Sequence, residues 1–211
     1  MRNVRLVERF TWRPVGLVAL FAMAMLASSC GQNQEQETRE TPAPAEEQTE
    51  SSSGSTAATP AGLGAKATAT IEPRSGSSLR GTATFTEEAE GVRVVVEVAG
   101  APPGDHAVHV HENGDCSAPD ASSAGSHFNP EQHEHGGPHT AVRHPGDFGN
   151  LTVGADSTGR IELVTKDLTV GESPISVVGL SIIVHEKADD FSQPVGNAGG
   201  RIGCGLIEAA S

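Results

Sequence analysis

The chain has 211 residues and a formal net charge of −13, from 14 Lys and Arg against 27 Asp and Glu. This length suits one ordinary domain with additional chain outside it. Such an acidic surface excludes nucleic acid and anionic lipid headgroups as electrostatic partners, and it repels an anionic substrate unless positive potential is concentrated locally.

The first 29 residues have the layout of a secretory signal peptide. Four arginines open the segment, an apolar run follows over residues 15–26, and small residues precede Cys30. The apolar run is shorter than the roughly 20 residues that a membrane-spanning helix needs. The ending L-A-S-S-C resembles a bacterial lipobox, in which the cysteine becomes the acylated first residue of the mature protein. We predict a cleaved signal over 1–29 and a lipid on Cys30; an uncleaved anchor or ordinary secretion is the alternative.

Residues 30–62 consist mainly of Gln, Glu, Thr, Ser, Pro and Ala. A segment with so little apolar bulk cannot offset the entropy of folding, so it is expected to be a flexible linker. Cleavage of the signal removes a net charge of +3 and leaves −16 on the mature chain. The lipid would anchor the protein to the cell membrane or the outer membrane, in the periplasm or at the cell surface, with domain 63–211 outside the cytoplasm.

After residue 62 the pattern consists of short runs of β-forming residues separated by Gly, Pro, Asp and Asn, without helical periodicity. This pattern predicts an all-β fold, an eight-stranded antiparallel Greek-key β-sandwich or barrel of the immunoglobulin-like kind. The expected strands are 66–71, 80–86, 92–98, 106–111, 151–153, 160–163, 180–185 and 202–207.

Two connections, 112–150 and 186–201, are too long to be hairpin turns. Long ordered loops in a compact β domain tend to carry function. The first is rich in His, Gly and Pro and lacks apolar bulk, so it needs a crosslink of another kind. A metal ion is the obvious candidate for that crosslink.

The segment H-A-V-H-V-H places histidines on an expected strand. His109 and His111 are two residues apart, so both side chains leave the same face of the strand and form a chelate. His106 leaves the opposite face and is expected to be a core or hydrogen-bonding residue. His185 ends the expected strand 180–185, where its side chain can join the site formed by His109 and His111. Ligation by imidazole alone suits copper.

Three histidines and an aspartate follow on the first long loop: His127, His135, His144 and Asp147. Three nitrogen ligands and one carboxylate make a tetrahedral set that suits zinc. From composition alone, a histidine-rich loop could equally be a loose zinc or nickel chelator.

Six segments, in order, resemble the copper/zinc superoxide dismutase family. They are H-V-H-E, G-S-H-F-N-P, H-G-G-P-H, R-H-P-G-D-F-G-N, V-V-G-L-S-I-I-V-H-E-K-A-D-D and G-N-A-G-G-R-I-G-C-G, and the resemblance runs from about residue 66 to 208. The spacings of eight, nine and three residues between the four loop ligands are also those of the family's zinc loop.

The resemblance implies a complete set of metal ligands and three neighbouring roles. Copper is bound by His109, His111, His127 and His185, and zinc by His127, His135, His144 and Asp147. His127 then bridges the two ions as an imidazolate and takes part in proton transfer. Arg201 stands over the copper and attracts the anionic substrate, and Asp189 links a copper histidine to a zinc histidine. His133 and His139 match no ligand position.

Cys116 and Cys204 remain free to pair if Cys30 carries a lipid, and the resemblance implies that they form a disulfide. It further implies an enzyme that dismutes superoxide to dioxygen and hydrogen peroxide and protects the cell envelope. Dimer contacts differ between branches of the family, so the oligomeric state is not carried over from the resemblance; a homodimer is a separate expectation. The loop 186–201 is shorter than in animal cytosolic members and lacks most of the charged residues credited there with guiding superoxide, so near-diffusion rates are not expected. The rival interpretations are a non-enzymatic copper/zinc-binding surface lipoprotein and a structural adhesion module.

Overall fold

The computed structural model describes residues 62–210. The expected signal peptide, Cys30 and nearly all of the linker lie outside the described residues. Within residues 62–210, no helix has the length and apolar character that crossing a membrane requires.

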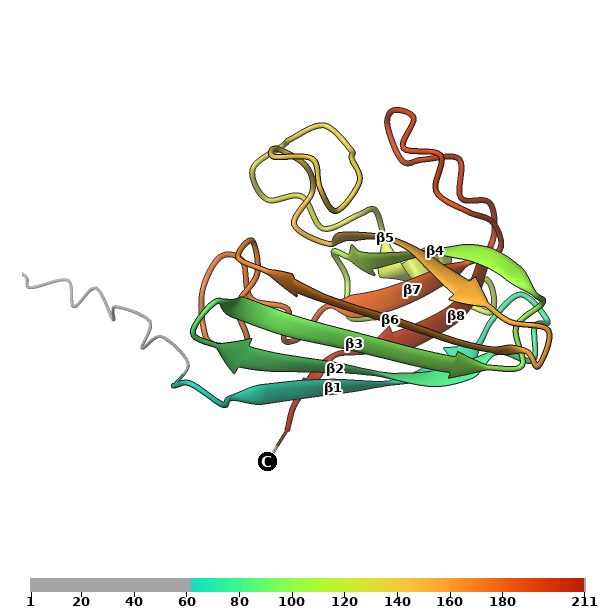
Figure 1. Cartoon of the computed structure of the whole chain (residues 1–211), viewed down its shortest axis with the longest axis horizontal. Coiled ribbons are helices and arrows are strands. Elements are labelled where there is room, and N and C mark those ends of the chain that lie inside the picture. Colours follow the sequence, from blue (N-terminus) through green and yellow to red (C-terminus); the bar gives the residue numbers. More distant parts are fainter. Residues whose placement is uncertain (1–61, 211) are drawn as a thin grey trace, which may run out of the picture. The chain divides into compact units, whose positions relative to one another are not determined.

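The domain is a closed antiparallel β-barrel, which confirms the predicted fold class (Figure 1). The strands follow the order β2-β3-β6-β5-β4-β7-β8-β1, and β1 pairs with β2 to close the barrel. The non-sequential neighbours, such as β3 beside β6, are Greek-key crossovers. The elements are β1 Lys66–Pro73, β2 Arg80–Glu88, β3 Gly91–Ala99, β4 Gly104–His111, the 3-10 helix η1 Ser122–Ala124, β5 Asp147–Val153, β6 Thr158–Thr165, β7 Ser181–His185, β8 Arg201–Leu206 and the two-residue β9 Glu208–Ala209.

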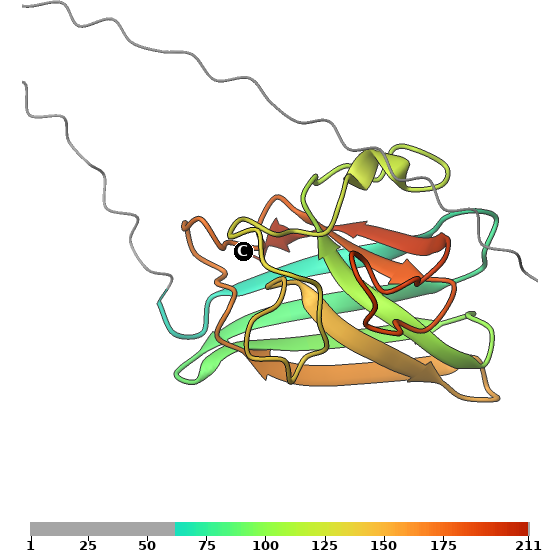
Figure 2. The same ribbon diagram turned by 90° about the horizontal axis from the view of Figure 1, so that it is seen from above.

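Strict alternation of apolar and polar residues builds the barrel interior. On β3, Val92, Val94 and Val96 are buried while Arg93 and Glu97 face solvent. The strand β4 differs, because all of its residues from His106 to His111 are buried. Its inward face packs in the core, and its outward face, which carries the metal-ligand candidates, is covered by the long loops. Both long loops lie on this side of the barrel (Figures 1 and 2).

Two element boundaries differ from the sequence-based expectation. Asp147 is the first residue of β5 rather than a residue of the long loop, and Arg201 is the first residue of β8. The connection 166–180 is a third long segment that the sequence pattern did not single out. It carries an isolated bridge between Thr169 and Ser176 rather than a helix or a strand.

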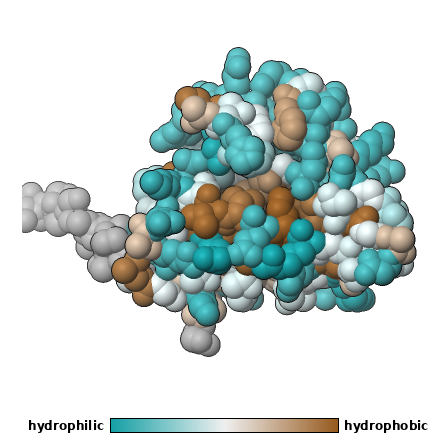
Figure 3. Space-filling view, in the orientation of Figure 1, coloured by the Kyte–Doolittle hydropathy of each residue, from teal (hydrophilic) through white to brown (hydrophobic). Residues whose placement is uncertain are grey.

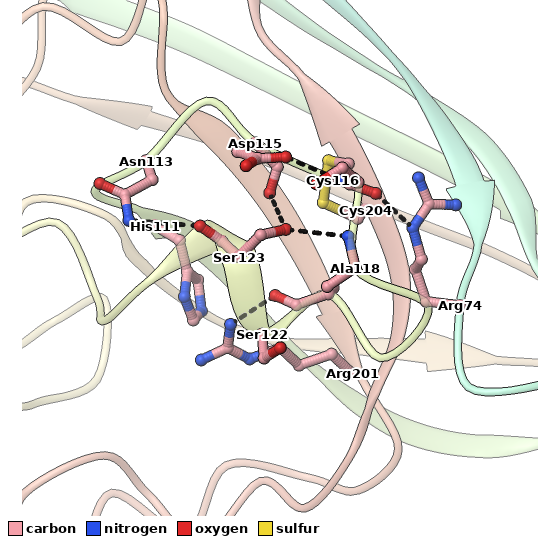
Figure 4. The surroundings of a disulfide bond; sticks show 12 residues. Arg74, His111, Asn113, Asp115, Cys116, Ala118, Ser122, Ser123, Arg201 and Cys204 are labelled. Carbon is pink, nitrogen blue, oxygen red and sulfur yellow. Dashed lines mark hydrogen bonds between the residues drawn. A yellow bond between two sulfur atoms is a disulfide. The ribbon is translucent and has the colours of Figure 1, made fainter.

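A disulfide joins Cys116 to Cys204 over a sequence separation of 88 residues, as predicted. It ties the first long loop to β8 (Figure 4). Beneath it, Ala121, Ala124, Ile183 and Cys204 form a small apolar cluster that is separate from the barrel core. The loop is therefore packed onto the barrel as well as covalently attached to it.

Candidate metal centre

The fold gathers the seven predicted ligands into two buried groups that share one residue. Their candidate ligand atoms lie within 4.8 Å of one another in each group. The groups are His109, His111, His127 and His185, and His127, His135, His144 and Asp147. β4 supplies two members, the end of β7 one, the first long loop three, and the start of β5 one.

Three ring nitrogens of the first group have no hydrogen-bond partner within the described part of the chain. They are Nδ1 of His109, Nε2 of His111 and Nε2 of His185, and all three are buried. The opposite nitrogens are engaged: His109 Nε2 donates to Asp189 at 2.8 Å and His111 Nδ1 to a loop carbonyl at 3.0 Å. These bonds fix the tautomers of His109 and His111, so the free nitrogens of these two rings carry lone pairs; Nδ1 of His185 lies 3.5 Å from the Gly199 carbonyl oxygen. Buried polar atoms are normally satisfied, and converging orphan lone pairs fit a metal ion.

In the second group, three imidazoles converge on one carboxylate. Asp147 Oδ1 lies 3.3 Å from Nδ1 of His127 and 3.3 Å from Nδ1 of His144. Its Oδ2 lies 2.9 Å from Nδ1 of His135 and accepts the backbone N–H of Gly136 at 3.0 Å. Three Nδ1 atoms and one carboxylate oxygen are the donor set of a tetrahedral zinc site.

Asp189 connects the two groups. Its carboxylate accepts a hydrogen bond from His109 Nε2 at 2.8 Å and from His135 Nε2 at 2.9 Å. Asn150 holds the main chain of Asp189, accepting its N–H at 2.7 Å and donating to its carbonyl at 3.0 Å. The backbone of the second loop comes very close here, since a Cβ on Gly196 would stand 1.8 Å from Asp189 Oδ1. This carboxylate therefore has a tightly fitted place between two buried rings.

The surroundings set the protonation of the metal-free groups. Burial lowers the pKa of His111 to about 2 and that of His127 to about 4, and it holds the pKa of His185 well below its usual range. For His135, burial acts in the opposite direction to the hydrogen bonds with Asp147 and Asp189, which raise its pKa to about 9. At neutral pH the first three rings are thus neutral and able to ligate, while His135 carries a proton.

A cavity of about 230 Å³ opens beside the first group. His111, His127, His185 and Arg201 line it together with Ser126, Val195 and Asn197. Arg201 donates from Nη1 to the Ala121 carbonyl and from Nη2 to the Gly125 carbonyl, both at 2.7 Å. The Gly125 carbonyl is the same one that accepts from His111. A fixed guanidinium therefore lies beside the orphan nitrogens in a cavity large enough for a small anion.

The remaining histidines lie outside both groups. His133 is half-buried and donates to the Arg143 carbonyl at 3.2 Å, and His139 is exposed. His106 is buried on the inner side of β4, with its ring nitrogens 2.8 Å from the His185 carbonyl and 2.9 Å from the Pro102 carbonyl. The sequence analysis missed Asn150, Gly196 and the carbonyls that hold Arg201, and no side-chain motif marks them.

The family model for copper/zinc superoxide dismutase (SODC) matches residues 79–207. The chain belongs to this family. A curated relative, "Superoxide dismutase [Cu-Zn]" of Deinococcus radiodurans, is 43% identical over 141 residues, covering 61% of this chain and 77% of the relative. A solved structure, that of the clock protein EA4, superposes with a TM-score of 0.64 at 38% identity, covering 71% of this chain and 97% of that chain.

The chain is accordingly a superoxide dismutase that uses copper and zinc. The donor chemistry described above fits both ions. Imidazole nitrogens with free lone pairs suit copper, and three nitrogens with one carboxylate suit zinc.

Proposed function

We propose that His109, His111, His127 and His185 hold the copper ion and that His127, His135, His144 and Asp147 hold the zinc ion. The observation that carries this assignment is the set of three buried orphan nitrogens on His109, His111 and His185. A zinc ligand set made of Nδ1 atoms leaves Nε2 of His127 for the copper side. His127, which belongs to both groups, would then bridge the two ions.

Copper, when bound, supplies the one-electron chemistry that oxidises one superoxide and reduces the next. His127 lines the cavity, and we assign its Nε2 to hold and release a proton for the reduced product. Its Nδ1 stays beside Asp147 in the zinc group, which keeps the ring in place. Asp189 fixes the orientation of His109 and His135 from behind, because each ring donates its remaining N–H to this carboxylate.

Arg201 attracts and orients superoxide. The guanidinium is the cation lining the cavity of a strongly acidic protein, and its two bonds to backbone carbonyls fix its direction. A fixed cation beside the reacting centre stabilises an anion by Coulomb attraction and by charge-assisted hydrogen bonds.

The test of this function compares His111→Ala with His133→Ala in the copper- and zinc-loaded full chain. The orphan Nε2 of His111 belongs to the copper group, whereas His133 lies on the first long loop outside both groups. His111→Ala should lose copper and dismutation while it retains zinc, and His133→Ala should keep both metals and full activity. Unchanged activity in His111→Ala would refute the assignment.

We further propose that the protein is a lipoprotein that protects the cell envelope. The support is the order of the sequence: a basic and apolar signal over 1–29, Cys30 after small residues, a polar linker to residue 62 and a disulfide-containing domain over 63–211. Cys30→Ser should abolish acylation and release the protein from membranes, and mass spectrometry of the mature N-terminus measures this. A water-soluble wild-type protein without lipid would contradict the proposal.

Pairing with a second copy is proposed on the apolar surface between β5 and β6. The strands β5 and β6 pair with each other at Val153 and Gly159 and are otherwise not paired with each other. The exposed Phe191 lines a cavity there together with Phe148 and Ile161, and Figure 3 shows apolar surface in the middle of the view. Sedimentation should give a dimer that Phe191→Asp converts to a monomer; a monomeric wild type would reject this partner.

A further inference from the structure

The position of the Arg201 guanidinium depends on two segments that are far apart in sequence. Its main chain belongs to the first residue of β8, whereas its two acceptors, the carbonyls of Ala121 and Gly125, belong to the first long loop. If the loop moves relative to β8, the guanidinium moves relative to His111. Something must therefore hold the loop and β8 together near this residue.

The turn between β1 and β2 contacts both segments. Toward the loop, Arg74 Nε donates to the Cys116 carbonyl at 3.0 Å, and the Ser75 N–H donates to the Pro119 carbonyl at 2.8 Å. Toward β8, the Arg74 N–H donates to the Ile202 carbonyl at 3.0 Å. Figure 4 shows Arg74 reaching toward Cys116 beside the disulfide, with Arg201 extending beneath the turn of η1.

Serine side chains add two more bonds on the β8 side. The Ser75 hydroxyl donates to the carbonyl of Arg201 itself at 2.9 Å, and the Ser77 hydroxyl donates to the Ile202 carbonyl at 2.6 Å. Ser75 thus binds the loop through its N–H and β8 through its side chain. Its φ of 52° is in the left-handed region, which a non-glycine residue adopts at a cost.

The disulfide alone does not fix the loop at the acceptors of Arg201. Cys116 is five residues before Ala121, and the carbonyl of Cys116 is engaged by Arg74 rather than by Arg201. Pro119, which Ser75 holds, is only two residues before Ala121. Ala121 is itself left-handed, with a φ of 57°, so its carbonyl direction depends on how the preceding residues are held.

We propose that the β1–β2 turn, residues 74–77, is a positioning element for Arg201. Arg74 and Ser75 attach the first long loop to β8. The loop carries the Ala121 and Gly125 carbonyls, and β8 carries Arg201. This inference rests on the proposed function of Arg201. Loosening the contacts of Arg74 and Ser75 misplaces the guanidinium relative to the copper site, and small misplacements of an orienting group reduce rates severalfold or more.

The test uses the full chain loaded with copper and zinc, and azide as a small anionic probe of the copper site. Arg74→Gln and Ser75→Ala should weaken azide binding, followed by copper absorption, by about threefold to tenfold, the size typical of coupling within one network. Arg74→Lys, which retains a cation and a donor, should restore most of the affinity. Arg80→Gln is the control for charge alone, since Arg80 is exposed and pairs with Glu72. Metal content should stay at wild-type levels in all of these variants.

A double-mutant cycle with Arg201→Lys decides between positioning and a general structural effect. If the turn acts through Arg201, Arg74→Gln and Ser75→Ala change azide affinity in the wild type but not in the Arg201→Lys background. Equal effects in both backgrounds, or no effect in the wild type, would overturn the proposal. If Arg201→Lys alone leaves azide affinity and activity unchanged, the function proposed for Arg201 itself fails, which is a separate result.

Discussion

Gly196→Ala is expected to weaken zinc binding through the carboxylate of Asp189. The added Cβ would stand 1.8 Å from Asp189 Oδ1 and 2.7 Å from His135 Nε2, so the loop or the carboxylate must shift. Asp189 is buried between two rings that it orients, and loss of such an outer hydrogen bond typically costs about 10- to 100-fold in metal affinity. The φ of +73° at Gly196 adds about 1–2 kcal/mol of backbone strain.

Gly179→Ala is the matched control, because it separates strain from the clash. Its φ is +87°, and nothing lies within 4 Å of an added Cβ. In denaturant unfolding of the metal-free protein, Gly179→Ala should lose about 1–2 kcal/mol from strain alone, and Gly196→Ala should lose more because the clash adds to its strain. Only Gly196→Ala should also lose zinc affinity, measured by competition with a chromophoric chelator. Equal zinc affinities in the two variants would refute the role assigned to Asp189.

Three further outcomes are expected. First, zinc uptake by the metal-free protein at pH 7 should release about one proton, because His135, with a pKa of about 9, must lose its proton to bind zinc. The zinc affinity should therefore fall about tenfold for each unit by which the pH lies below this pKa. Calorimetry in two buffers measures this, and zero release would contradict it. Second, replacing Cys116 and Cys204 together by Ser should lower the free energy of unfolding by about 4–5 kcal/mol, given the 88-residue separation. A change below about 1 kcal/mol in denaturant titrations would argue against this. Third, Arg201→Gln should reduce dismutation at low ionic strength by about tenfold or more, with a smaller ratio at high salt because screening removes the steering term. A salt-independent ratio, measured by stopped-flow, would show that Arg201 does not steer.

The sequence by itself determined the fold class and singled out the candidate metal ligands that the fold gathers into two buried groups. Alternation such as that of β3 encodes which face of a strand is buried, and two histidines two residues apart encode a chelate on one face. Metal ligands are side chains of a few types at restricted spacings, so candidates such as His109, His111 and the histidines of the loop can be recognised from the sequence alone. The pairing of Cys116 with Cys204 followed from the resemblance and is present.

Element boundaries were less well determined. The sequence placed Asp147 on the loop and Arg201 before the last long strand, and both are the first residues of strands. A Gly- and Asn-rich segment such as D-F-G-N lacks strand propensity, and its pairing with β4 is imposed by its neighbours.

Only the tertiary structure decided what holds the site in shape. The groups that accept hydrogen bonds from Arg201 and His111 are the backbone carbonyls of Ala121 and Gly125, and Ser75 contacts the loop through its N–H and β8 through its hydroxyl. Every residue carries a carbonyl, so no sequence pattern distinguishes the carbonyls that accept hydrogen bonds from Arg201. The need for glycine at position 196 likewise arises from a carboxylate seven residues away in sequence that chain folding brings within contact. The types of side chain determine the chemistry of the site, whereas the geometry of the site depends on which backbone atoms the barrel and its loops bring together.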